Sequence, residues 1–300
     1  MNIGFAWMIR RRNVVGVVVG VLMLLPQTGW GQEAEKSVPN AAVESRAEPE
    51  TALVLGPGKS LKDARKCFER EAVWGYAPAQ VNLAVLYLNG WGTEKNYGSA
   101  LYWLKEAAKQ DQPQAYTNLG LLYLNGWGVA RNYEEALKNF RTAAEHGETG
   151  AMVNVGYMAE NGMGTARDQA VAGEWYRRAA DRGDALGQNN LADLFLRGLG
   201  VAQSDALAAE WFQKAADQGQ TGARIKLGFL YMTGRGVAKD ATAAYAWILA
   251  ASLAGDHRGD EYLSELRAQM KPEQLEAATR RANELRVARQ ASAAESAFVR

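Results

Sequence analysis

The sequence predicts an all-α fold: a right-handed α-solenoid of helix–turn–helix repeats, followed by C-terminal capping helices. Three observations predict it. Alanines recur 36 residues apart at Ala79, Ala115 and Ala151, without insertion or deletion. Glycines recur in pairs at the same spacing, and apolar residues within each unit follow a helical period, as from Ala115 to Asn125. Such a unit buries its apolar face only against its neighbours, so the repeats must stack.

The sequence marks where the first helix of each unit ends and where the second begins. Paired glycines end the first helix, because glycine reaches the left-handed conformation that helix ends often require. They are Gly90/Gly92, Gly126/Gly128, Gly162/Gly164, Gly198/Gly200 and Gly234/Gly236. A residue that can cap an N-terminus then begins the second helix. These predicted caps are Asn96, Asn132, Asp168, Ser204 and Asp240.

The repeats have a recognisable pattern. From Ala115 to Val129 they read Ala-x-x-x-Leu-Gly-x-x-Tyr-x-x-Gly-x-Gly-Val, which resembles the Sel1-like repeat family, a relative of tetratricopeptide repeats. The resemblance covers a half repeat from about Ser60 to Pro78 and five repeats from Ala79 to about Arg258. The third repeat departs from it at Ala159 and the fourth at Gly187. It implies a protein-interaction role, such as regulating a sensor kinase, assembling envelope machinery or engaging a host protein.

The two ends of the chain are expected to differ from the solenoid. Residues 1–31 read as a cleavable signal peptide, with Arg10, Arg11 and Arg12 before an apolar run from Val14 to Leu25; an uncleaved anchor is the alternative. The expected location is therefore periplasmic or secreted. Residues 32–58 read as a disordered leader and 59–258 as the solenoid. Capping helices are expected over 259–290, the last ending at about Arg289, and a frayed tail over 291–300.

Composition excludes several functions. The chain has 34 basic and 33 acidic residues; without the three arginines of the signal, 31 − 33 gives a net charge of −2. This balance argues against a nucleic-acid partner and gives no overall attraction to an anionic membrane. No stable membrane insertion is expected after signal cleavage. The lone Cys67 is expected to be buried, with an intermolecular disulfide as the alternative.

The sequence offers little for catalysis. His146 and His257 are the only histidines, and neither has a second histidine or a cysteine at ligand spacing. No nucleophile or phosphate-binding motif appears. We therefore expect no enzymatic activity, no cofactor and no metal. A β-lactamase-like or penicillin-binding hydrolase is an alternative, since some cysteine-rich relatives are so described, although their regular cysteine pairs are absent here.

One column of polar residues predicts the binding face. Asparagine is unfavourable inside a helix and needs a reason there. The column holds Asn82, Asn118, Asn154, Asn190 and Lys226, and the same face carries Tyr157 and Phe229. On the concave surface of a solenoid it would suit an extended segment of another envelope or host protein. The same asparagines could instead bridge neighbouring repeats, and the two roles are compatible.

Two tryptophans form a second candidate. Trp91 and Trp127 lie between the paired glycines of the first two repeats. They predict either an exposed edge patch for a partner or side chains folded back over their turns. A patch of this kind could also serve a peptidoglycan- or carbohydrate-binding module, which is the third functional alternative. The expected function remains that of an exported scaffold for protein contacts in the bacterial envelope.

Overall fold

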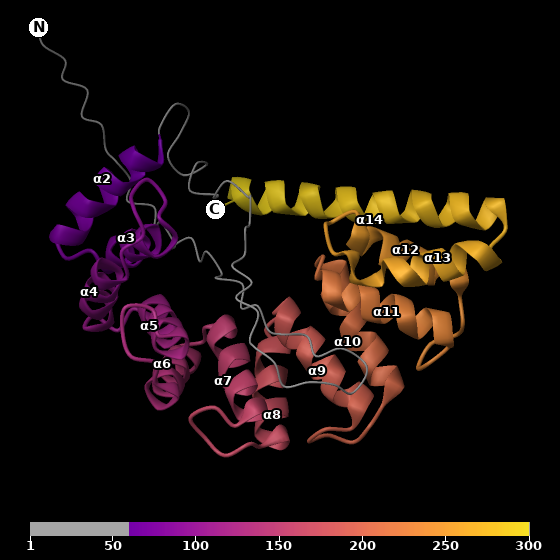
Figure 1. Cartoon of the computed structure of the whole chain (residues 1–300), viewed down its shortest axis with the longest axis horizontal. Coiled ribbons are helices and arrows are strands. Elements are labelled where there is room, and N and C mark those ends of the chain that lie inside the picture. Colours follow the sequence, from indigo (N-terminus) through magenta and orange to yellow (C-terminus); the bar gives the residue numbers. More distant parts are fainter. Residues whose placement is uncertain (1–59, 300) are drawn as a thin grey trace, which may run out of the picture. The chain divides into compact units, whose positions relative to one another are not determined.

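The computed structural model describes residues 60–299, with side chains as far as 286. These residues form α-helices and one short 3-10 helix, and the described range contains no strand (Figure 1). Helix α2 packs against α3, and consecutive helices from α5 to α12 pack against one another, so the predicted all-α solenoid is confirmed. The predicted signal peptide and leader lie outside the described residues.

Each repeat contributes two helices. The first helices are α3 (Ala77–Asn89), α5 (Pro113–Asn125), α7 (Thr149–Asn161), α9 (Ala185–Arg197) and α11 (Thr221–Thr233). The second helices are α2 (Leu61–Val73, from the half repeat), α4 (Tyr97–Ala108), α6 (Tyr133–Glu145), α8 (Gln169–Ala180), α10 (Asp205–Asp217) and α12 (Ala241–Ser252). The 3-10 helix η1 (His257–Gly259) then leads to α13 (Asp260–Gln269) and α14 (Pro272–Val299). Helix α14 thus continues past Arg289, where the sequence predicts its end.

The chain divides into two compact units, Met1–Ala107 and Ala108–Arg300. In the described part of the first unit, α2 packs against α3. A capping box begins α2: the Ser60 hydroxyl accepts from the amide of Asp63, whose carboxylate accepts from the amide of Ser60. In the second unit each helix from α5 to α12 packs on the next along the chain.

The predicted caps begin the second helices. Asn96 Oδ1 accepts from the amide of Ser99 at 2.8 Å, and Asn132 Oδ1 from that of Glu135 at 3.0 Å. Asp168, Ser204 and Asp240 cap the following second helices in the same way. Each bond satisfies an amide that the first helical turn leaves unpaired. The cap column therefore fixes where the second helix of each repeat starts.

The two glycines of a pair have different tasks. Gly126, the first of its pair, ends α5 in the left-handed conformation at φ 71°. Gly200, the second of its pair, passes so close to the preceding repeat that a Cβ there would lie 2.3 Å from the backbone of Gln169. The turn of one repeat therefore rests on the start of the previous second helix, and any larger residue would separate the two repeats.

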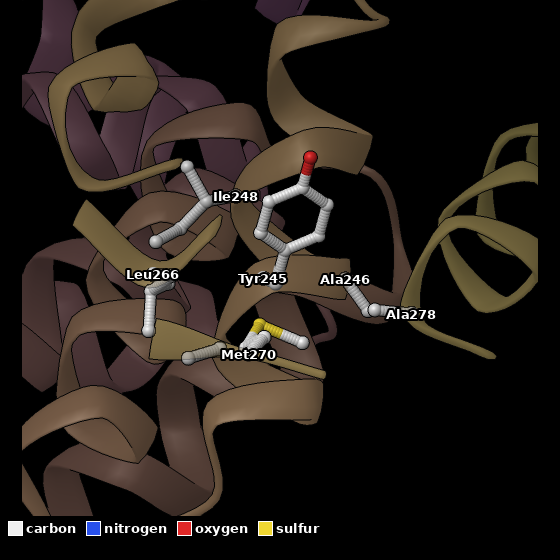
Figure 2. Close-up of a cluster of buried hydrophobic side chains, with 7 residues drawn as sticks. Tyr245, Ala246, Ile248, Leu266, Met270 and Ala278 are labelled. Carbon is white, nitrogen blue, oxygen red and sulfur yellow. The ribbon is translucent and has the colours of Figure 1, made fainter. Parts of the chain in front are cut away.

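The C-terminal helices share a core with the last repeat. Buried side chains of α12, α13 and α14 meet there, as Figure 2 shows. They include Tyr245, Ala246 and Ile248 of α12, with Leu266 and Ala278 from the two helices that follow. Helix α14 packs mainly on α12. The end of the last repeat is thus covered by these helices, as a solenoid terminus requires.

Cys67 differs from expectation. It is half-buried, and its thiol lies 3.7 Å from Glu71 Oε1. Its neighbour Phe68 is also half-buried, whereas Phe140, at the same repeat position, is fully buried. Among the described helices, α2 packs against α3.

Candidate functional site

The first helices of the second unit provide its inner face. Helix α7 packs on α6 and α8 and also contacts α9 directly. The second helices α6 and α8 are joined chiefly through the first helix between them. Helices α7 and α9 therefore approach each other more closely than α6 and α8 do, which places these first helices on the inner side of the stack. This is the side on which the sequence predicts binding.

The asparagine column is mostly buried. Asn118, Asn154 and Asn190 are only 8%, 5% and 8% exposed, and Asn82 of the first unit is half-buried. Asn118 Nδ2 donates to the carbonyl oxygen of Gln114 at 2.8 Å, one turn earlier in its own helix. These amides therefore offer little surface to a ligand, and their role in binding stays a prediction.

Two consecutive repeats are joined by a polar cluster around Lys226. The Lys226 ammonium on α11 forms an ion pair with Asp193 on α9 and lies 3.3 Å from Asn189 Oδ1. It also lies 5.4 Å from the ring centroid of Phe212. The bridging interpretation therefore describes Lys226 well. The sequence indicates this ion pair in one way: Lys226 replaces the asparagine of its repeat position, and Asp193 replaces the apolar or aromatic residue of a nearby position one repeat earlier.

Asn190 occupies the same cluster. Its Oδ1 accepts from Asn189 Nδ2 at 3.0 Å. Its own Nδ2 is buried and has no hydrogen-bond partner among the described residues. Because a buried amide without a partner costs free energy, this position is a weak point of the fourth repeat.

Tyr157 and Phe229 lie in different surroundings. Tyr157 is half-buried on α7, and its pKa is raised by burial and then by the charges of Glu160 and Tyr133. The ring centroid of Phe229 lies 5.9 Å from that of Tyr262 on α13, so the capping helices flank it. Of these two predicted contact residues, Phe229 is thus flanked by a capping helix, whereas Tyr157 lies on a helix of the repeats.

Other amides of the inner helices are exposed. Asn125 and Asn161 stand at the last position of α5 and α7, and their Nδ2 groups donate to the carbonyl oxygens of Leu121 and Tyr157 at 2.9 and 2.8 Å. These bonds orient each amide. Its oxygen remains an acceptor that a partner can reach.

The two tryptophans belong to different compact units. Trp91 lies in the first and Trp127 in the second, and both are half-buried. At the same repeat position Arg235 forms two hydrogen bonds with Asp205, at 2.8 and 3.0 Å, across to the start of α10. This position can therefore join one repeat to the one before it, while a joint patch of the tryptophans stays a prediction.

One column with a shared role was not predicted. Four side chains near the start of a first helix donate to the carbonyl oxygen eight residues earlier, at the end of the preceding second helix. The pairs are Gln80 to Ala72, Tyr116 to Ala108, Gln188 to Ala180 and Arg224 to Ala216, at 3.1, 2.9, 3.3 and 3.1 Å. These positions share a hydrogen-bonding role but not a residue type, and Met152 stands at the same position in the third repeat. Periodic patterns in the sequence therefore do not reveal it.

The described residues give no support for metal chemistry or membrane spanning. They contain no group of three or more His, Cys, Asp or Glu side chains that could hold a metal ion. Within the same range, each helix is too short or too polar to cross a membrane.

The repeats match a known family model. The Sel1 repeat model fits residues 77–112, 113–148, 149–184, 185–220 and 222–256. The chain belongs to the Sel1-repeat family. Sel1-repeat proteins generally mediate protein–protein interactions, and their solenoids are typically non-enzymatic scaffolds. The inner face described above is thus part of a fold that generally serves interaction.

Solved Sel1-repeat structures resemble this protein. One is a protective antigen of uropathogenic Escherichia coli with an SLR fold, at 30% identity and a TM-score of 0.64, over 78% of this chain and 52% of the antigen. This chain therefore spans about half of the antigen's length. Another is a Sel1 repeat protein from Oxalobacter formigenes, at 31% identity and a TM-score of 0.60, over 63% of this chain and 76% of that one. Comparison with curated proteins gives no match.

Proposed function

We propose that this Sel1-repeat protein is an exported scaffold of the bacterial envelope, and that the inner face of its second unit binds an extended segment of another protein. The observation that supports it most directly is the run of first helices on the inner side of the stack. Their accessible side chains combine exposed amides at Asn125 and Asn161, the half-buried ring of Tyr157 and the exposed charge of Arg197.

This combination suits an extended segment for chemical reasons. Amide oxygens accept hydrogen bonds from backbone N–H groups whatever the sequence, while an aromatic side chain contributes apolar contact area. Repetition every 36 residues, as at Asn125 and Asn161, presents the same group at successive points along a strand-like ligand. No feature described for the site favours the hydrolase alternative or the glycan-binding alternative.

The test compares two variants in capture of envelope proteins. We would immobilise the chain from Gln32 onward, unchanged and as Tyr157→Ala with Asn161→Ala. The control carries Glu174→Ala with Lys138→Ala, two exposed positions on the second helices α8 and α6. A partner retained by the control and lost by the inner-face variant supports the proposal. A partner retained by both, with matching circular dichroism, contradicts it.

The envelope location has its own test. Fractionation of cells that produce the full chain, followed by N-terminal sequencing of the protein, measures both compartment and cleavage. Recovery outside the cytoplasm with Gln32 at the N-terminus supports export and signal removal. Recovery in the cytoplasm with Met1 retained contradicts them.

A further inference from the structure

The first described helix carries an exposed basic stripe that ends in a tryptophan. Lys62, Lys66 and Arg70 follow one another every four residues along α2, and Trp74 takes the next such position at its C-cap. A four-residue step advances about 40° around a helix, so the three cations fall within about 80° of arc. We call these four residues the α2 stripe.

The cations of the α2 stripe are available to a partner. All three are exposed, and within the described part of the chain none of them forms an ion pair. The acidic residues of α2 are engaged elsewhere: Glu69 pairs with Arg65, and Glu71 accepts from the Cys67 thiol. Asp63 is held in the capping box with Ser60. With Arg65, helix α2 carries four basic residues against three acidic ones, so the helix keeps a small positive charge, and the stripe lines up three of its four cations.

The apolar end of the stripe is unusually exposed. Trp74 is 86% and Val73 74% exposed, and Tyr76 lies beside them at 47%. The positions equivalent to Trp74 in the later repeats are polar or small. They are Gln110, His146, Arg182, Gln218 and Ala254. The repeat itself therefore does not need an aromatic residue here. A polar outer face would suit a terminal helix, but it explains neither Trp74 nor Val73.

We propose that the α2 stripe is a docking surface for an anionic lipid bilayer. Lysine and arginine attract anionic headgroups, and tryptophan favours the boundary between headgroups and acyl chains. The stripe belongs to one helix and one turn, a convex surface that a bilayer meets without matching a groove. The chain before α2 also carries the apolar run Val14–Leu25, predicted as an export signal or anchor, and either role would bring this end to the membrane.

This docking is peripheral and independent of the peptide-binding function proposed for the second unit. The stripe lies wholly within the first compact unit. It involves side chains at the bilayer surface and no helix that crosses the bilayer. The overall charge of −2 predicted for the exported chain gives no general attraction to anionic membranes. The attraction inferred here comes from one local cluster.

The test is co-sedimentation of the chain from Gln32 onward with lipid vesicles. That chain contains every described residue and lacks the Val14–Leu25 run, which could itself insert. We expect binding to vesicles of phosphatidylglycerol mixed with phosphatidylcholine, little binding to pure phosphatidylcholine, and weaker binding as salt is added. Equal binding to both kinds of vesicle, or to neither, would overturn the proposal.

Two variants and a matched control assign the effect to the stripe. Lys62→Gln with Lys66→Gln and Arg70→Gln should weaken binding about 100-fold, since each cation near the surface contributes about 1 kcal/mol. Trp74→Ala should weaken it on the order of tenfold through lost apolar burial. The control neutralises three other exposed cations, with Lys138→Gln, Arg141→Gln and Arg267→Gln, and should bind as the unchanged chain does.

Two further results decide against the lipid surface. Loss of binding in the control variant to the same extent would show that total charge, not the stripe, is responsible. Salt-sensitive binding of the unchanged chain to immobilised polyglutamate, without binding to anionic vesicles, would assign the stripe to an acidic protein segment. Circular dichroism of each variant must match that of the unchanged chain, and Trp74→Ala, at an exposed position, keeps the test decisive if the triple variant unfolds.

Discussion

The hydroxyl of Tyr176 donates a hydrogen bond to Glu160 Oε2 at 2.8 Å, and both residues are exceptions in their columns. The repeats on either side have Leu124 with Phe140 and Leu196 with Phe212, all buried and without a polar side-chain atom. The third repeat has thus exchanged an apolar pair for a hydrogen-bonded pair. The two changes make physical sense only together, because either alone leaves a polar group without its partner.

A double-mutant cycle should detect this coupling. Tyr176→Phe leaves the Glu160 carboxylate without its donor, and Glu160→Leu leaves a buried hydroxyl unpaired. Each single change should lower the free energy of unfolding by about 1–3 kcal/mol. The double variant restores the Leu–Phe pair of the neighbouring repeats, so it should lose less than the sum of the two. Urea denaturation measures all four proteins, and additive losses would contradict the coupling.

The same tyrosine predicts loss of stability at alkaline pH. Burial raises the pKa of Tyr176 well above its ordinary value near 10, and the charge of Glu160 raises it further. The folded state therefore keeps a proton that the unfolded state releases above about pH 10. Its contribution to stability is complete below that pH and falls as pH rises toward the folded pKa. Tyr176→Phe should therefore make the decline in stability above about pH 10 shallower. An unchanged slope in chemical denaturation would contradict this.

The sequence predicts best what is local and periodic. The cap column and the glycine pairs each depend on a few neighbouring residues, so the structure confirms Asn132 as a cap and Gly126 as a left-handed helix end. Burial of the asparagine column was not predictable in this way. Whether Asn154 faces a ligand or a neighbouring helix depends on how deeply adjacent repeats pack, and its residue type suits both.

Exceptions to a column carry information that the column itself does not. Lys226 and Asp193 interrupt two columns with opposite charges and form an ion pair, as Tyr176 and Glu160 interrupt two others and form a hydrogen bond. Comparing exceptions between neighbouring columns could have found both pairs. It could not have found the bond from Arg224 to Leu285, because α14 lies outside the repeat and has no column to compare.

Asp111 should be a position where a single change stabilises the fold. It adopts φ 52°, a left-handed conformation that costs a residue with a Cβ free energy, while the equivalent Gly147, Gly183 and Gly219 carry no such cost. Asp111→Gly should raise the free energy of unfolding by about 0.5–1 kcal/mol. Tyr116 would lose its 3.1 Å contact with Asp111 but keep its bond to the carbonyl oxygen of Ala108.

The reverse change is a matched control. A Cβ at Gly147 would meet no atom within 4 Å, so Gly147→Asp introduces the backbone cost without a clash. Gly147→Asp should lower the midpoint of thermal unfolding, and Asp111→Gly should raise it by a similar amount. A midpoint that falls in Asp111→Gly would show that the aspartate side chain contributes more than its backbone conformation costs.

Arg224 should hold the last helix against the repeats. It is 1% exposed, and its guanidinium donates to the carbonyl oxygens of Ala216, Ala250 and Leu285 at 3.1, 3.2 and 3.2 Å. Gln188, at the same position one repeat earlier, donates to one carbonyl oxygen, that of Ala180, which corresponds to Ala216, while its own Oε1 accepts from Gln218. Arg224→Gln should therefore keep the first bond and lose the other two. Helix α14 would lose one of its attachments to the last repeat.

Hydrogen exchange of the α14 amides measures this directly. In Arg224→Gln we expect exchange in residues 272–286 to accelerate at least tenfold, since each lost bond to a charged group is worth about 1.5–3 kcal/mol. Arg267→Gln removes an exposed cation of α13 and should leave the exchange unchanged. Ala278→Asp places a charge in the buried contact of α14 and shows the exchange of a displaced helix. If Arg224→Gln exchanges like Arg267→Gln, the apolar cluster around Tyr245 and Ala278 holds α14 by itself, and the guanidinium serves only the ends of the repeat helices.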